Sequence, residues 1–227
     1  MSDGTTPGTH RVKDIFPGPE ASYPLLLTAV GNEVFFNAKR QIGGPSELWK
    51  SDGTEAGTVL VDGQAGGKRA NLGNTLFFER GDAIEGLRLW KSDGTPEGTV
   101  PVATIAPPEV EEGLEDLIVV NGKLYFTADD GVHGRELWCY DPALNVAFMV
   151  ADIRPGPNTG GPRMLTNVGS LLYFQQWTAQ NGTELWAFDT REQVIPTVST
   201  WGAVVLLAIL LIAGSLILKR NRCVIIA

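Results

Sequence analysis

The chain has 227 residues, of which 43% are hydrophobic and 19% charged, and 26 acidic against 18 basic residues give it a net charge of −8. This acidic balance argues against nucleic-acid binding, which depends on clustered Lys and Arg. Two cysteines do not make a disulfide framework, and residues 1–190 are long enough for one domain with a sizeable core.

One segment occurs twice in nearly the same form. Its copies are ELWKSDGTEAGTVLV at Glu47–Val61 and RLWKSDGTPEGTVPV at Arg88–Val102. SDGTTPGT at residues 2–9 and Glu-Leu-Trp at 136–138 and 184–186 continue the pattern. The tryptophans of the four Leu-Trp copies lie 41, 48 and 48 residues apart. A period of this length is typical of propellers, solenoids and arrays.

Each repeat predicts a four-stranded antiparallel meander. The first two strands should be joined by tight turns at Gly31-Asn32, Gly73-Asn74, Asn121-Gly122 and Gly169-Ser170, where positive φ angles match the strand twist. An aromatic second strand follows each turn, the third strand contains Leu-Trp, and the fourth follows the GTxxGT segment.

In a sheet with one solvent-exposed face, apolar and polar residues alternate along each strand, and these strands do not show that alternation. Large apolar residues are adjacent at Phe35-Phe36, Phe77-Phe78, Tyr125-Phe126 and Leu48-Trp49. Neighbouring strand residues point to opposite faces, so both faces must be covered. We therefore predict an all-β, β-propeller-like fold of about four blades.

Both ends of the repeat region are incomplete. Arg11 to Ile15 is expected to be a fourth strand, and the last repeat stops after its third strand at Glu184–Phe188. Pairing of these two strands would close a ring of four blades without an exposed edge. A chain cut from a longer array would have the same incomplete ends.

The repeated Asp-Gly-Thr sequences are predicted to be structural turns. Asp is expected to bond nearby amides, Gly to take a positive φ angle, and Thr to add a second local bond. The residues concerned are Asp52, Gly53, Thr54, Asp93, Gly94 and Thr95.

No catalytic residue or cofactor is predicted. His10 and His133 lack the neighbours of a metal site, and neither a GxSxG elbow nor a phosphate-binding glycine loop is present. Glu47, Glu136 and Glu184 recur with the repeat, which suggests a shared structural bond. An alternative is a Ca²⁺ site that uses Asp129 and Asp130, or the stretch from Glu109 to Asp116.

The repeats resemble the bacterial ELWxxDGT family, on the two full copies and on the approach Asp129–Trp138 to the third Leu-Trp. Copies three and four depart from it, with Cys139–Pro142 and Ala187–Thr190 in place of the Lys-Ser-Asp-Gly-Thr turn. The resemblance covers about residues 2–190. It implies an exported, surface-associated protein and no catalytic residue.

The C-terminal region predicts a membrane anchor. Residues 201–218 carry no charge, which is near the lower length limit of about 17 to 25 residues for a spanning helix. We place the helix at 203–218 and a basic cytoplasmic tail at 219–227, which directs the repeat domain away from the cytoplasm. The basic stop consists of Lys219, Arg220 and Arg222.

The linker at 191–202 resembles IPTL-type C-terminal sorting signals of Gram-negative bacteria. The residues that carry this resemblance are Ile195, Pro196, Thr197, Val198, Trp201 and Gly202. It implies a membrane-embedded processing enzyme as a partner. Val198 stands where the family prefers Leu, and the tail Cys223–Ala227 is a second departure.

The sequence thus predicts a non-enzymatic cell-envelope protein that presents a binding or structural module to a surface polymer or protein. The alternative is an envelope enzyme or a Ca²⁺-dependent carbohydrate-binding adhesin. Residues 1–5 contain no basic start or apolar stretch of a signal peptide. Either the true start lies upstream, which we favour, or the protein is cytoplasmic and tail-anchored.

Overall fold

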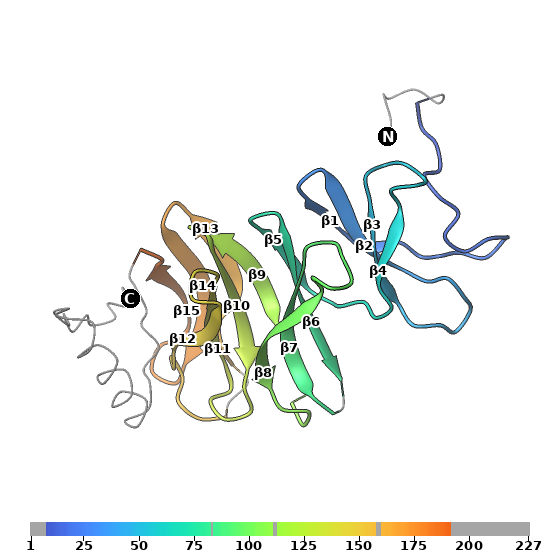
Figure 1. The fold of residues 1–227 in the computed structure, drawn as a ribbon. Coiled ribbons are helices and arrows are strands. Elements are labelled where there is room, and N and C mark those ends of the chain that lie inside the picture. The colour runs from blue at the N-terminus through green and yellow to red at the C-terminus, as the bar shows by residue number, and fades with distance from the viewer. Residues whose placement is uncertain (1–7, 83, 111–112, 158–159, 192–227) are drawn as a thin grey trace, which may run out of the picture.

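The computed structural model describes residues 8–82, 84–110, 113–157 and 160–191. These residues form 15 β-strands and no helix, in four antiparallel sheets that stand in a row in sequence order (Figure 1). The all-β architecture of repeated meanders is therefore confirmed. We call the sheets blades 1 to 4.

Consecutive strands are neighbours in every blade. Blade 1 contains β1 (Leu25–Val30), β2 (Glu33–Ala38), β3 (Glu47–Ser51) and β4 (Val59–Asp62). Blade 2 contains β5 (Arg69–Leu72), β6 (Thr75–Asp82), β7 (Gly86–Ser92) and β8 (Val100–Ala106). Blade 3 contains β9 (Glu115–Val120), β10 (Lys123–Asp129), β11 (Arg135–Asp141) and β12 (Val146–Ala151). Blade 4 contains β13 (Arg163–Val168), β14 (Leu171–Thr178) and β15 (Gly182–Asp189).

The four predicted tight turns all join the first and second strands of their blades. Gly31, Gly73 and Gly169 open three of these turns with φ angles of 59°, 60° and 63°. The blade 3 turn uses Asn121 at 49° and Gly122 at 74°. Gly and Asn tolerate this left-handed region better than other residues do, and this explains why these residue types recur at the turns.

Blades 1 and 3 bury apolar residues on both faces, as the paired apolar residues predict. In blade 1, Phe35 packs toward blade 2, whereas its neighbour Phe36 lies in a separate cluster on the opposite face. In blade 3, Tyr125 packs against blade 4 and Phe126 against blade 2. We call the face turned toward the next blade the trailing face and the face turned toward the preceding blade the leading face.

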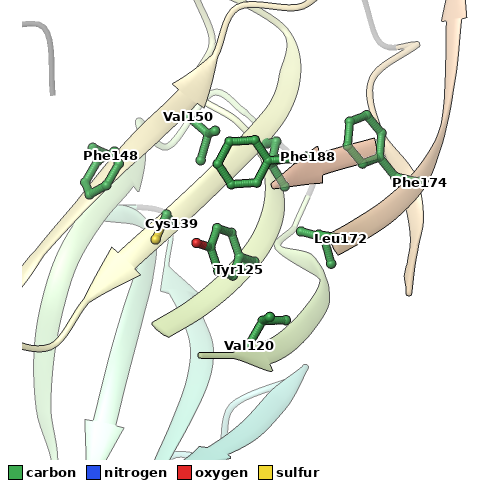
Figure 2. Packing of buried hydrophobic residues seen from close by; sticks show 9 residues of the cluster. Val120, Tyr125, Cys139, Phe148, Val150, Leu172, Phe174 and Phe188 are labelled. Carbon is green, nitrogen blue, oxygen red and sulfur yellow. The ribbon is translucent and has the colours of Figure 1, made fainter. Parts of the chain in front are cut away.

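The interface between blades 3 and 4 illustrates this packing (Figure 2). Tyr125 and Cys139 of the trailing face of blade 3 meet Leu172 and Phe188 of the leading face of blade 4. The rings of Tyr125 and Phe188 lie 5.9 Å apart at a tilt of 56°, a favourable arrangement for aromatic pairs. Cys139 is a free, buried thiol in β11, and burial raises its pKa to about 11, so it serves as an apolar packing residue.

The leading faces share an aromatic pair formed by the second and third strands. Phe78 stacks on Trp90 in blade 2 with ring centroids 6.5 Å apart, and Phe126 stacks on Trp138 in blade 3 at 6.4 Å. The Leu of each Leu-Trp sequence points the other way, and Leu48 is fully buried on the trailing face of blade 1. The repeat therefore encodes a complementary pair of surfaces.

The prediction that Arg11 to Ile15 forms a strand is wrong, and the alternative in which it pairs with β15 is not seen. Residues 11–15 are not in a strand, and among the described residues blade 4 has three strands. Blades 1 and 4 lie at opposite ends of the row (Figure 1). The N-terminal segment instead covers the leading face of blade 1.

This N-terminal cover depends on one apolar contact and two kinds of hydrogen bond. Ile15 packs against the cluster of Phe36 and Trp49, where a preceding blade would supply a trailing face. Lys13 Nζ donates to the backbone oxygen of Thr58 at 2.7 Å, and the Lys39 amide donates to the Ser22 carbonyl at 2.8 Å. An irregular segment thus buries the apolar surface in place of a sheet.

Candidate binding surface

The Asp-Gly-Thr turn of blade 1 is a closed set of local hydrogen bonds. Asp52 Oδ1 accepts from the amide and the hydroxyl of Thr54 at 2.9 and 2.8 Å. Thr54 Oγ1 then accepts from the Gly57 amide at 2.9 Å, and Gly53 has a φ angle of 92°. The bonds to Thr54 hold the pKa of Asp52 below its usual range.

Blade 2 repeats this turn almost bond for bond. Asp93 Oδ1 accepts from the amide and hydroxyl of Thr95 at 2.9 and 2.8 Å, and Gly94 has a φ angle of 91°. A Cβ atom at Gly98 would lie 2.1 Å from Oδ1 of Asp93, so only glycine fits there. The motif GTxxGT therefore encodes turn geometry, and its carboxylates are already engaged.

The candidate Ca²⁺ residues Asp129 and Asp130 also engage in local bonds. Asp129 Oδ1 accepts from the Gly131 amide at 2.7 Å, while Asp130 accepts from the amides of Val132 and His133 and pairs with the His133 ring at 2.7 Å. That ring contact raises the pKa of His133. The described part of the chain contains no group of three or more His, Cys, Asp or Glu side chains that could hold a metal ion.

The recurring glutamates do not share one structural bond, contrary to expectation. Glu47 accepts three hydrogen bonds from the guanidinium of Arg40. Glu136 is fully buried and accepts the backbone amides of residues 153 and 154, each at 3.0 Å. Burial raises the pKa of Glu136 to about 7. Glu184 is exposed, and the chain that corresponds to residues 153 and 154 in blade 4 lies outside the described residues.

The trailing face of blade 4 is an uncovered repeat surface among the described residues. Leu185 is 70% exposed, although the equivalent Leu48, Leu89 and Leu137 are buried. Val168 is also exposed, whereas the equivalent Val120 is buried. This face keeps the apolar character of the repeat, and no described blade packs against it.

A pocket of about 360 Å³ lies on this part of blade 4. Arg163, Gln175, Trp177 and Thr183 line it, together with backbone at Gly160 and Gly161. The guanidinium carbon of Arg154 lies 4.2 Å from the ring centroid of Trp177, which is 40% exposed. Neither Arg154 nor Arg163 forms an ion pair with a described carboxylate. The pocket therefore combines an aromatic surface with positive charge in an acidic protein.

A second pocket of about 290 Å³ lies between the N-terminal segment and blade 1. Arg11, Val12, Ile15 and Pro24 line one side of it, and Phe36 lies on the sheet side. The pocket thus lies where the irregular N-terminal segment covers the sheet.

The sequence did not single out the residues around the blade 4 pocket. Trp177 falls three residues after the aromatic run of β14, outside the repeated Leu-Trp positions, and Arg154 lies in the connection after β12. The sequence signal that could have indicated this pocket is a tryptophan outside the repeated positions, next to Gln175 and Gln176 near the end of a strand. Comparison of the repeats does not identify such a residue, because no other copy has it.

The C-terminal predictions lie outside the described residues. They comprise the sorting motif at Ile195–Val198 with Trp201 and Gly202, the proposed helix at 203–218 and the basic stop at Lys219, Arg220 and Arg222. Within the part of the chain that is described, no helix is long and apolar enough to cross a membrane.

Comparisons with known proteins support the fold alone. No protein-family model matches the chain, and no curated protein matches it. A puromycin hydrolase S511A mutant complexed with PGG is similar in structure at a TM-score of 0.50 and 16% identity, over 71% of this chain and 26% of the hydrolase. The present chain thus spans about a quarter of that protein.

Two further solved structures are similar at lower scores. TolB from Acinetobacter baumannii matches at a TM-score of 0.46 and 10% identity, over 73% of this chain and 40% of TolB. A thermostable family-43 glycoside hydrolase matches at 0.34 and 12% identity, over 78% of this chain and 70% of that one. The described residues have a propeller-like β fold of repeated blades.

Proposed function

We propose that this chain is a non-enzymatic cell-envelope protein whose propeller-like repeats form a rigid binding or structural module, held at a membrane by the C-terminal apolar segment. The observation that carries the proposal is the use of the repeat motif itself. Its Asp, Gly and Thr residues build turns, and its Phe, Leu and Trp residues build contacts between blades. The recurring chemistry of the repeat is thus scaffold chemistry, which leaves binding to loops and exposed faces.

The anchor part of the proposal is supported by the sequence beyond blade 4. An uncharged stretch at 201–218 precedes a basic cluster, and the acidic head would be repelled by anionic lipid. We propose that the basic tail stays cytoplasmic, that the head lies outside the cytoplasm, and that an enzyme in the membrane processes the chain near Ile195–Val198.

Protease protection of the full chain in a Gram-negative host tests this topology. The expected result is a head in the membrane fraction that is digested only when protease reaches the non-cytoplasmic side. A matched variant with Leu207→Arg and Leu211→Arg should leave the membrane fraction. Recovery of both proteins in the soluble fraction would contradict the anchor, and mature protein that retains Ala227 would contradict processing.

A saccharide-binding role is a second candidate, favoured by the blade 4 pocket. Trp177 offers an apolar ring for a sugar face, and Arg163, Gln175 and Thr183 offer hydrogen-bonding groups around it. The positive charge of Arg154 and Arg163 favours an acidic sugar. We propose binding of an envelope or matrix polysaccharide as the use of this face.

A glycan array that includes uronic acids tests the second candidate with purified full chain in detergent. Binding should be lost in Trp177→Ala and kept in Tyr23→Ala, which removes an exposed aromatic ring that does not line this pocket. Parallel thermal shifts with Ca²⁺ and with EDTA separate this role from a Ca²⁺-dependent adhesin. Equal binding by both variants would contradict the pocket as the site.

A further inference from the structure

The pocket between the N-terminal segment and blade 1 offers a mostly apolar surface. Ile15 of the N-terminal segment lines it together with Val34 and Phe36 of β2. Leu27 of β1 also lies in the lining and is 66% exposed to solvent. Apolar side chains from two separate pieces of chain thus surround a volume of about 290 Å³.

The charge of this lining is opposite to that of the whole chain, which has 26 acidic and 18 basic residues. Arg11 and Lys13 line the pocket, and among the described residues no Asp or Glu does so. Asp14 pairs with Arg11 at 3.1 Å but lies outside the lining. The pocket therefore favours an anion over a cation.

The backbone of blade 1 holds the Lys13 ammonium group in place at the pocket. Lys13 Nζ donates to the carbonyl oxygen of Thr58 at 2.7 Å and to that of Glu55 at 3.3 Å. An ammonium group has three N–H donors, so these two bonds leave one donor for a ligand. Because the charge is positioned before a ligand arrives, binding costs less ordering of the side chain.

Two hydroxyl groups in the lining are already engaged within the protein. Ser51 Oγ and Thr58 Oγ1 lie 2.7 Å apart and bond to each other. Ser51 Oγ also accepts from the Gly53 amide at 3.0 Å, and Thr58 Oγ1 donates to the Thr54 carbonyl at 2.6 Å. These bonds leave the hydroxyls little capacity for a polyhydroxylated ligand, which favours an apolar body over a sugar.

We propose that this pocket binds a small carboxylate with an apolar body, such as an aryl or a branched aliphatic acid. The apolar body lies against Phe36 and Ile15, and the carboxylate meets Lys13 and Arg11. The volume of about 290 Å³ is near the lower limit of the range of about 300–1,000 Å³ for small-molecule sites, so the ligand must be compact.

Such a ligand would touch the N-terminal segment and the sheet at once, so its binding should hold the two together. The Lys39 amide donates to the carbonyl of Ser22, a lining residue, at 2.8 Å. Bound ligand should slow hydrogen exchange at this amide. The Thr190 amide, which donates to the Ser170 carbonyl in blade 4 at 2.9 Å, should not change.

Titration of the purified full chain in neutral-lipid nanodiscs with phenylacetate tests the site. Phenylacetamide is the matched probe, because it keeps the ring and lacks the charge. The expected result is saturable binding of phenylacetate with a Kd of about 1 mM or tighter, about tenfold tighter than phenylacetamide. No saturable binding of phenylacetate, or equal binding of the two probes, would overturn the proposal.

Two variants of β1 assign the binding to this pocket. Leu27→Asp places a carboxylate in the lining and should weaken phenylacetate binding by about tenfold or more, because like charges repel. Leu25→Asp is the matched control, since Leu25 is 61% exposed on the same strand and does not line the pocket. Equal effects of the two changes, or a Lys39 amide whose exchange does not respond to phenylacetate, would overturn the site. The blade 4 pocket and the membrane anchor take no part in these measurements, so failure of either leaves the results unchanged.

Discussion

The two ends of the row of blades differ in whether their outward apolar face is covered. At blade 1 the leading face carries Phe36 and Trp49, and the segment with Ile15 lies over them, so both aromatic residues are buried. At blade 4 the trailing face carries Leu185 and Val168, and both are exposed. The repeat encodes complementary faces wherever it occurs, and only the neighbouring chain decides whether a face is covered.

Truncation of equivalent leucines measures this difference most directly. Leu137→Ala, at a buried trailing position, should lower the free energy of unfolding by about 2–5 kcal/mol because it removes packed methyl groups and leaves a cavity. Leu185→Ala at the same repeat position should change it by less than about 0.5 kcal/mol. Urea denaturation of both full-length variants provides the comparison. Similar losses would show that the blade 4 face is covered in the full chain.

The glutamates that precede these two leucines, Glu136 and Glu184, should differ in how they make the stability of the fold depend on pH. The folded-state pKa of Glu136 is raised from 4.5 to about 7, so the unfolded chain releases this proton first as the pH rises. Stability should therefore fall between pH 4.5 and about 7, by an amount on the order of 3 kcal/mol, and level off above.

Glu136→Gln should remove this dependence, because the amide cannot ionise. Glu184→Gln is the control, since Glu184 is exposed. Denaturation midpoints over the pH range measure both. A slope that persists in Glu136→Gln, or one that vanishes in Glu184→Gln, would assign the titration to another group.

The cover on blade 1 should contribute a smaller, local stability. Ile15→Ala removes part of a half-buried side chain from Phe36 and Trp49, with an expected loss of about 1–2 kcal/mol. Asp14→Ala is the control, because Asp14 forms an ion pair with the exposed Arg11 at the surface. The fluorescence of Trp49 should report solvent exposure of the leading face of blade 1. Equal effects of both changes would contradict the role of Ile15.

Substitutions in the turns after the third strands of blades 1 and 4 should give the smallest difference in stability. Thr54→Val in blade 1 removes the hydroxyl that bonds Asp52 and Gly57, at a cost of about 1 kcal/mol. Arg191→Ala in blade 4 breaks only an exposed pair with Asp189 and should leave stability unchanged within error. Thermal unfolding of the two variants tests this ranking, and a larger loss in Arg191→Ala would reverse it.

The sequence predicts the stacking of the blades because adjacent apolar residues in a strand require both faces of the sheet to be covered. Phe35-Phe36 and Tyr125-Phe126 require two covered faces, and Gly or Asn at the turns fixes the hairpins. The repeated Asp-Gly-Thr bonds follow from local geometry for the same reason. Local chemistry and long-range packing agree at these positions, so a single sequence is sufficient.

The sequence fails where a residue acts outside the repeat. Arg11 to Ile15 occupies the place of a fourth strand in the repeat, but Pro17 and Pro19 follow it and it packs as an irregular cover. Glu47 and Glu136 occupy one repeat position and have unlike partners, because their surroundings come from connections of different length and composition. Trp177 has no counterpart in other copies, so only the fold shows that it lines a pocket.

The cover over Phe36 and Trp49 also bears on how molecules meet one another. Each molecule holds a trailing surface at blade 4 and a matching leading surface at blade 1, and such unlike, complementary ends join head to tail. Contacts of that kind form rings or open filaments. The stretch around Ile15 already occupies the leading surface of blade 1, so a head-to-tail contact at that surface would have to displace it.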